Sequence, residues 1–257
     1  MQAGQLLLFV LALSFAVAAG LVGCIALMRR MLLAGDVISH LALPGLGLAF
    51  AFKLNPIAGG AATLFVGTFL VWQLQKKTDL ATEAAIGVIF AAALAIGAAI
   101  TPSEDLAESL FGAMASISPV GFVLGLAAIL FVVFSVFLLR DQLSLSIFST
   151  DLAAATGVNT VRIDLYFLLL FSLTVLVGIR FMGALLASAL IIMPSATARQ
   201  ITNKLPYFFL FAMAASFLSV AAGFLLNLFV LKYSTAGPTI AMISAALFGL
   251  TLLSKPK

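Results

Sequence analysis

Charged side chains are scarce in this chain. Of its 257 residues, 9% are charged (13 lysines and arginines against 9 aspartates and glutamates), whereas 64% are hydrophobic. An average soluble domain carries roughly 25% charged and 45–50% apolar residues. These few charges cannot cover a soluble surface, and the basic residues are too dispersed to form a nucleic-acid-binding patch. The composition therefore excludes both classes of protein and indicates a polytopic membrane protein.

Cysteine and the common catalytic motifs are also lacking. The single cysteine, Cys24, excludes an intrachain disulfide and a zinc site built on cysteines, and its apolar surroundings favour a packed thiol. The sequence has no Gly-Lys pair, hence no P-loop and no ATP site of its own. It has neither a Gly-x-Ser-x-Gly elbow nor a zinc-protease helix. We therefore expect neither an enzyme nor a resident cofactor.

The apolar residues come in runs of bilayer length. A helix needs about 20 apolar residues to cross the hydrocarbon core, and these runs are too long for barrel strands. The segment 106–117 is too short to cross and is predicted to be a short helix at the outer face. We predict an all-α polytopic membrane protein, a single transmembrane domain over 1–257, with about nine spans: 5–28, 35–53, 56–75, 84–101, 119–139, 164–180, 182–199, 205–231 and 237–254.

The basic residues give the predicted orientation, because lysine and arginine accumulate in cytoplasmic loops. With the N-terminus outside, ten basic residues lie on the inner side and three, Lys53, Arg180 and Lys232, on the outer side. We therefore predict an extracytoplasmic N-terminus and a cytoplasmic C-terminus.

The longest predicted cytoplasmic connection runs over about 140–164. Within it, Ser, Thr and Asp at 149–151 precede an alanine-rich turn that ends at Gly157. This order is typical of a short helix with an N-cap and a glycine after its last turn. An ordinary loop is the alternative. A capped helix under the membrane would suit the docking of another subunit.

The second predicted span contains the only histidine, His40, four residues after Asp36. Ionisable residues inside a span are costly, and residues four apart share one helix face. A carboxylate and an imidazole suit a first-row divalent metal. Pro44 lacks the N–H that would bond the His40 carbonyl. The carbonyl oxygen of His40 would then be free to join the two side chains as a ligand. The alternative is structural: Asp36 caps the helix start and His40 is its hydrogen-bonded neighbour.

The seventh predicted span, 182–199, has small residues at intervals of four, such as Gly183 and Ala187, and a proline near its inner end, Pro194. Small residues at this spacing allow helices to approach closely. Tight packing is one interpretation, and a second wall of a translocation path is the other. A similar stripe in the fourth span indicates packing: Gly87, Ala91 and Ala95.

Several motifs together resemble one known family. Those of the second helix are Arg29-Arg30-Met31, Gly35-Asp36, Ser39-His40 and Leu43-Pro44-Gly45. Later matches are Ala85-Ile86-Gly87, Asp105-Leu106, Leu110-Phe111-Gly112, Asp151-Leu152-Ala153, Gly157-Val158, Gly183-Ala184-Leu185-Leu186, Pro194-Ser195-Ala196-Thr197-Ala198 and Ala236-Gly237-Pro238. In these motifs, over most of its length, the chain resembles the membrane permeases of bacterial zinc/manganese/iron ABC importers.

The resemblance implies a homodimeric permease in the bacterial plasma membrane. Its partners would be two cytoplasmic ATP-binding subunits and an extracytoplasmic metal-binding protein. It also implies that Asp36 and His40 are metal ligands, and that the segment with Asp151, Leu152 and Gly157 contacts the ATPase. Residues 113–116 depart from the family, because they carry no polar anchor where relatives often do.

The predicted function is ATP-driven import of a divalent transition-metal ion by alternating access. Two alternatives are an ABC permease for a metal chelate, such as a siderophore or a cobalamin-like ligand, and a secondary carrier driven by an ion gradient. A third is a structural membrane protein, in which Asp36 and His40 serve stability alone.

Overall fold

The computed structural model describes residues 3–78, 80–100, 118–231 and 236–253. In these residues every regular element is a helix. In chain order they are α1 (Ala3–Met28), α2 (Ala34–Ser39), η1 (His40–Ala42), α3 (Leu43–Ala51), α4 (Pro56–Lys77), α5 (Thr82–Ile100), α7 (Pro119–Phe148), α8 (Thr150–Ala155), α9 (Thr160–Met182), α10 (Ala184–Ile201), α11 (Leu205–Leu226), η2 (Asn227–Leu231) and α12 (Gly237–Leu253).

The helix ends follow local chemistry. Four helices begin after a side chain that accepts a backbone N–H from the first turn: Asn55, Ser118, Ser149 and Asn159. Such N-caps satisfy amide groups that have no partner within the helix. Gly183, at φ +86°, separates α9 from α10 in a conformation that glycine adopts readily.

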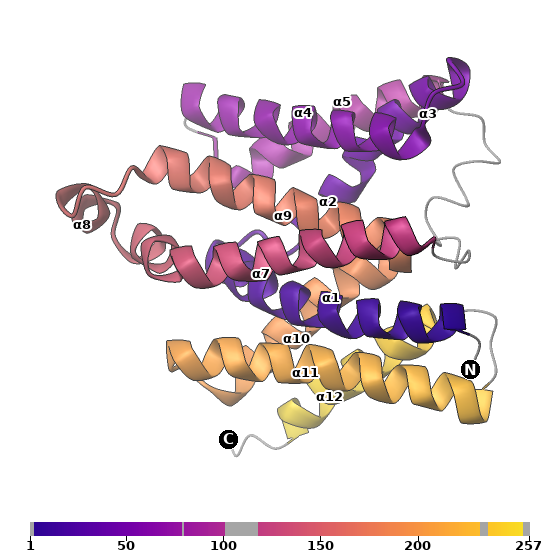
Figure 1. The fold of residues 1–257 in the computed structure, drawn as a ribbon. Helices are drawn as coiled ribbons and strands as arrows, with labels where there is room; N and C mark the ends of the chain where they lie inside the picture. The colour runs from indigo at the N-terminus through magenta and orange to yellow at the C-terminus, as the bar shows by residue number, and fades with distance from the viewer. Residues whose placement is uncertain (1–2, 79, 101–117, 232–235, 254–257) are drawn as a thin grey trace.

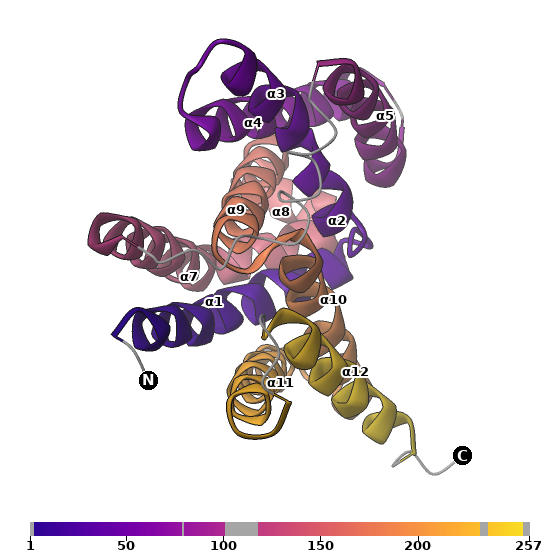
Figure 2. The same ribbon diagram turned by 90° about the vertical axis from the view of Figure 1, so that its right-hand side faces the viewer.

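The long helices run roughly side by side (Figure 1). In both views α3, α4 and α5 gather at one side of the bundle and α11 and α12 at the other, with α1, α9 and α10 between them (Figures 1 and 2). In α1 and α9, 56% of the most apolar window is buried, against 17% in α5. These two helices therefore form the centre of the fold.

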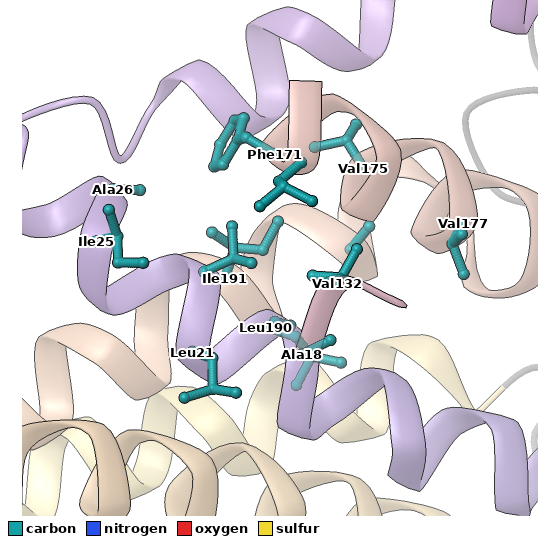
Figure 3. Packing of buried hydrophobic residues seen from close by; sticks show 14 of the residues in the cluster. Ala18, Leu21, Ile25, Ala26, Val132, Phe171, Val175, Val177, Leu190 and Ile191 are labelled. Atoms are coloured by element: carbon teal, nitrogen blue, oxygen red, sulfur yellow. The ribbon is translucent and has the colours of Figure 1, made fainter. Parts of the chain in front are cut away.

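The core is apolar and its backbones approach closely. Figure 3 shows Leu21 and Ile25 of α1, Phe171 of α9 and Ile191 of α10 in one packed cluster. A Cβ at Gly20 would lie 2.8 Å from the Ala212 carbonyl oxygen, and one at Gly23 would collide with the Ile191 carbonyl oxygen. The glycines of α1 therefore allow α10 and α11 to pack against its backbone, as small residues do in membrane helices.

The outer surface carries many large apolar side chains. On α7 alone, Phe134 and Leu138 are 67% and 70% exposed. An apolar surface of this extent is not stable in water and fits a lipid environment. Among the described residues, six helices are long and apolar enough to cross a membrane: α1, α4, α5, α7, α9 and α11.

Each of the nine predicted spans coincides with helix, so the all-helical membrane fold is confirmed, but the count of nine crossings is not. The other three spans are shorter: the broken segment 34–51, and the helices α10 and α12. The predicted connection 140–164 is mostly helical, because α7 continues to Phe148 and α8 and α9 follow. The predicted outer helix 106–117 lies outside the described residues.

The small-residue stripe of α5 does not pack against another helix of the same chain, so the packing predicted for it is wrong at this level. Gly87, Ala91 and Ala95 are all exposed, and a Cβ added at Gly87 would meet nothing within 4 Å. The stripe lies on the uncovered side of α5, which is also the least buried of the long helices. Small residues there create no close contact between helices of the same chain.

One end of the bundle, here called the basic end, gathers basic residues from distant parts of the chain. Arg30 and Arg199 line one cavity there, and Arg29 bonds Asp164 at the start of α9. Lys76 lies over the ring of Trp72, whose indole N–H donates to the Val161 carbonyl at the same end. This clustering brings together residues that the sequence assigned to one side of the membrane.

Gly23→Ala is predicted to destabilise the fold, because the new methyl group must displace the backbone of α10 at Ile191. Overpacking of this kind costs about 1–3 kcal/mol. Gly249→Ala is the matched control, since nothing lies within 4 Å of a Cβ there. The thermal unfolding midpoint in detergent should fall for Gly23→Ala and stay level or rise for Gly249→Ala. Equal midpoints would refute the close approach of α1 to α10.

Candidate functional site

The candidate site lies where the second predicted span is broken. The helix α2 ends at Ser39, a single 3-10 turn covers His40 to Ala42, and α3 begins at Leu43. Pro44 has no N–H to offer the His40 carbonyl, but that carbonyl accepts the N–H of Leu43 instead. The predicted unpaired oxygen at His40 is therefore wrong. The proline changes the helix type rather than leaving a carbonyl without a partner.

The residues that surround the break show that it lies about halfway along the bundle. A Cβ at Gly35 would lie 3.5 Å from Phe171 and 3.8 Å from Ile191, which are near the middle of α9 and α10. The His40 ring centroid lies 5.7 Å from that of Phe90, near the middle of α5. In Figure 1 α2 lies between the two ends of the long helices, and Figure 2 shows it at the edge of the bundle between α5 and α10. Asp36 and His40 are therefore at mid-depth of the helices.

Both ionisable side chains at the break are half-buried and have no polar partner among the described residues. The bond at Asp36 involves its backbone: the Ser39 hydroxyl donates to the Asp36 carbonyl oxygen at 2.5 Å. The N-cap of α2 is Leu33, without a side-chain cap. The structural alternative, in which Asp36 caps the helix and bonds His40, is therefore wrong.

A carboxylate and an imidazole four residues apart, without protein partners, leave donor atoms for a ligand. Both groups suit a divalent transition metal. Among the described residues no group of three or more His, Cys, Asp and Glu side chains gathers. One chain thus offers two side-chain ligands, which is too few for the closed four-ligand site typical of structural zinc.

The helix α10 forms a wall beside the break. Ile191 lies against Gly35, and Pro194 is buried inside α10 one turn further on. The hydroxyl of Ser195 donates to the carbonyls of Ile191 and Ile192, both at 2.8 Å. Hydroxyls that bond back in this way satisfy themselves within a helix that contains proline. Tight packing of α10 is thus observed, and its role in a path stays a prediction.

Arg29 lies at the basic end, a few residues before the broken segment, and its side chain is 13% exposed. Its guanidinium donates to the Asp164 carboxylate at 2.5 Å and to the Ser146 hydroxyl at 3.1 Å, and it lies 4.9 Å from the centre of the Phe167 ring. Arg29 therefore ties the end of α1 to α7 and α9, the two helices that flank α8.

The predicted capped helix at the basic end is present as α8. The Ser149 hydroxyl accepts the N–H of Leu152 at 3.1 Å. Gly157, at φ +80°, and Val158 donate their N–H groups back to Ala154 and Ala153. This is the hydrogen-bond pattern of a Schellman cap. Asp151 and Leu152 are exposed, and α8 extends beyond the ends of the other helices in Figure 1.

Three features around the site were not predicted from the sequence. They are the Phe90 ring against His40, the ion pair of Arg29 with Asp164, and a buried hydroxyl pair between Thr68 and Ser172, 2.6 Å apart. Each joins residues more than 45 positions apart. The only signal in the sequence was that Asp164 stands at the same predicted membrane side as Arg29.

Comparison with known proteins shows relatives over almost the whole chain. The sequence model of the ABC 3 transport family matches residues 5–255. The manganese transport system membrane protein MntC of Halalkalibacterium halodurans is 30% identical over 243 residues, 93% of this chain and 82% of that protein. The high-affinity zinc uptake system membrane protein ZnuB of Haemophilus influenzae is also 30% identical over 243 residues, 91% of each chain.

Two solved structures share the fold. A chain of PsaBC from Streptococcus pneumoniae, in complex with Fab, has a TM-score of 0.82 at 23% identity, covering 99% of this chain and 93% of that one. A metal-chelate type ABC transporter in an inward-facing conformation has a TM-score of 0.77 at 16% identity, covering 97% and 86%. At these identities the likeness describes the fold alone.

Asp164→Asn is predicted to lower stability, because it leaves the nearly buried Arg29 guanidinium without a counter-charge. A hydrogen bond to a charged group contributes about 1.5–3 kcal/mol. Asp141→Asn is the control, since the Arg140–Asp141 pair is 57% and 91% exposed and contributes little. Thermal unfolding in detergent measures both. If Asp141→Asn lowered the unfolding midpoint as much as Asp164→Asn, the structural role of the Arg29–Asp164 pair would be contradicted.

Proposed function

The chain belongs to the ABC 3 transport family, and on that premise we propose that it is the membrane-spanning permease of an ATP-driven metal importer. Its cargo is a divalent transition-metal ion, zinc or manganese as in the names of its relatives, or iron. Carboxylate and imidazole ligands suit all three ions. The chain handles no ATP itself, because hydrolysis takes place in a partner subunit.

One observation carries the proposal: Asp36 and His40 lie at mid-depth on a broken helix without any polar partner among the described residues. Leaving a carboxylate unpaired at such a depth is costly, so the position implies a functional group. Transporters commonly bind substrate near the bilayer midplane on helices that are interrupted there. Asp36 and His40 are therefore the ligands that the passing ion meets.

The basic end faces the cytoplasm in this proposal, and the N-terminus lies outside. The basic residues gathered there agree with the excess of lysine and arginine on the cytoplasmic side of membrane proteins. The chain then crosses nine times, with the broken segment 34–51 and the helices α10 and α12 as the three shorter crossings. The metal-binding protein docks at the opposite end.

The capped helix α8 is the contact with the ATP-binding subunit. Its caps hold its shape, and exposed Leu152 and Asp151 offer an apolar and a charged group to a partner. Gly157 turns the chain back towards α9. Because Arg29 bonds both helices that flank α8, a displacement of α8 would reach Arg29, which follows α1 and lies seven residues before Asp36.

Two copies form the transport path. A single chain supplies two side-chain ligands, and a second copy would double this to two carboxylates and two imidazoles. The exposed small-residue stripe belongs to α5, the helix whose Phe90 contacts the His40 ring, and it offers a close-packing surface for that copy. Alternating access then opens the ligands first to the binding protein and later to the cytoplasm.

The rival functions fit less well. Membership of an ABC family disfavours a carrier driven by an ion gradient, which would not need α8. A permease for a metal chelate shares this fold. However, a siderophore or a cobalamin-like ligand brings its own donors to the metal, so the unpartnered Asp36 and His40 would have no role.

Asp36→Ala and His40→Ala are each predicted to reduce metal uptake at least about tenfold, because each removes a ligand. Uptake of radioactive zinc and manganese would be measured in cells or vesicles that contain the complex assembled with its ATPase. Asp141→Ala, which removes an exposed carboxylate, is the control and should transport normally. Near-normal uptake by both ligand variants would refute the metal site.

Leu152→Asp is predicted to abolish metal-stimulated ATP hydrolysis without unfolding the permease, because Leu152 is 53% exposed and its side chain supports no core contact. The ATPase activity of the reconstituted complex measures the effect. Ile201→Asp is the control, because Ile201 is an about equally exposed apolar residue on the proposed cytoplasmic side and lies outside α8. Stimulation that survives Leu152→Asp would remove α8 from the ATPase contact.

A further inference from the structure

A cavity at the basic end has a composition that the transport of a cation does not explain. It lies between the ends of α1, α7 and α10 and the start of α11, and its volume is about 330 Å³. Arg30 and Arg199 line it together with Asn203, and no acidic residue does. Most of its other walls are apolar, among them Phe148 and Phe208. The cavity therefore combines two positive charges with a hydrocarbon lining.

Neither guanidinium group has a hydrogen-bond or ion-pair partner among the described residues. The ion pairs there are those of Arg29 with Asp164 and of Arg140 with Asp141. Both Arg30 and Arg199 are exposed. Guanidinium groups bind phosphate and carboxylate through paired N–H donors, so an anion would complete this cavity.

A mainly apolar groove adjoins the cavity along α11, and Arg140 is the one charged residue in its lining. Leu205 and Phe208 line the cavity, and Pro206 and Phe209 line the groove, which has a volume of about 280 Å³. Its walls are α7 and α11 and its floor is α1 at Leu21. In Figure 1 the three helices lie next to one another in this order, with α1 between α7 and α11. Exposed Phe137 and Leu210 flank the groove, so it opens to the surroundings of the bundle.

We propose that this cavity and groove bind an anionic phospholipid of the inner leaflet. The phosphate of its headgroup pairs with Arg30 and Arg199, and an acyl chain lies in the groove between α7 and α11. Basic pockets between helices on the cytoplasmic side are suited to such headgroups. The combination of charge and adjoining apolar groove distinguishes a lipid from a soluble anion, which would use the charge alone.

The lipid would hold together three helices that meet the working parts of the permease. The helix α7 leads into α8, α1 leads into the connection to Asp36, and α10 forms the wall beside the break. Binding of the lipid is independent of the metal ligands, so this proposal and the transport function can fail separately.

Arg30 offers a variant that does not threaten the fold. Its φ is +60°, and the N–H groups of Arg30 and Met31 donate to the carbonyls of Leu27 and Ala26. This is a Schellman cap, in which glycine is the usual residue at the left-handed position. Arg30→Gly therefore removes the guanidinium and relaxes the backbone at the same time.

The test uses the purified full chain in detergent, with phosphatidylglycerol or phosphatidylcholine added, and native mass spectrometry to measure the lipid retained. We expect phosphatidylglycerol to be retained in preference to phosphatidylcholine. Arg30→Gly and Arg199→Gln should each weaken its retention about fivefold, the usual effect of one basic residue near an anionic surface. The control is Arg162→Gln, an exposed basic residue of the same end that lines neither the cavity nor the groove.

A second variant tests the acyl chain. Met213→Trp fills the groove without changing any charge, and it should also weaken retention of phosphatidylglycerol. Glycerol phosphate, which has no acyl chains, should not displace the lipid.

Equal retention of both lipids, or equal losses for Arg30→Gly and Arg162→Gln, would overturn the proposal. Displacement of the lipid by glycerol phosphate would identify a site for a soluble anion instead. If Arg30→Gly and Arg199→Gln weakened binding of the ATPase and left lipid retention unchanged, the cavity would be part of the ATPase contact, and the lipid site would be refuted.

Discussion

The way in which residues 34–51 satisfy their backbone hydrogen bonds governs the rest of the structure. Inside a bilayer no water replaces a missing partner, so a helix can break only where another bond takes over. Pro44 removes one N–H, and the Leu43 N–H bonds the His40 carbonyl in its place. The resulting 3-10 turn puts His40 at the exact point where helix type changes, four residues after Asp36. The break is thus held by a hydrogen bond and does not depend on a ligand.

Several buried polar groups elsewhere in the bundle are hydrogen-bonded, although buried side-chain atoms of Gln75, Ser216, Thr239 and Ser244 have no partner among the described residues. Hydroxyls of α9 and α10 bond carbonyls of their own helix, and the Ser172 hydroxyl of α9 bonds that of Thr68 on α4. The nearly buried Arg29 has Asp164, Ser146 and the Phe167 ring. Asp36 and His40 differ from the unpartnered neutral groups because both are ionisable and lie at mid-depth. A carboxylate without a partner is costly at that depth, and this cost is the reason for proposing a passing cation as its ligand.

Much of the fold could be predicted from the sequence, because apolar runs of bilayer length and cap residues are local signals. The nine ranges, the cap at Ser149 and the turn at Gly157 needed no tertiary information. The interruption of the second span could not be predicted in detail: Pro44 indicated a missing bond, but not that Leu43 would supply it. The exposure of Gly87 was also missed, since small residues pack equally well against the same chain or another one.

At the candidate site, too, the sequence could predict some features and not others. Asp36 and His40 were found because a lone histidine and a carboxylate share a helix face inside an apolar run. The contact with Phe90 and the depth set by Phe171 and Ile191 come from helices more than 45 residues away, and no spacing predicts them. The sequence therefore predicted Asp36 and His40 as candidate ligands, and the tertiary structure supplied their position and their lack of polar partners.

The most direct test of the central claim is pulsed electron paramagnetic resonance of the assembled permease complex loaded with Mn²⁺. An imidazole bound to the metal gives a nitrogen hyperfine coupling. We predict this coupling in the unmodified complex and its loss in His40→Gln, with the ion still bound by Asp36. A manganese spectrum without nitrogen coupling, or one that His40→Gln leaves unchanged, would contradict the assignment of the metal site.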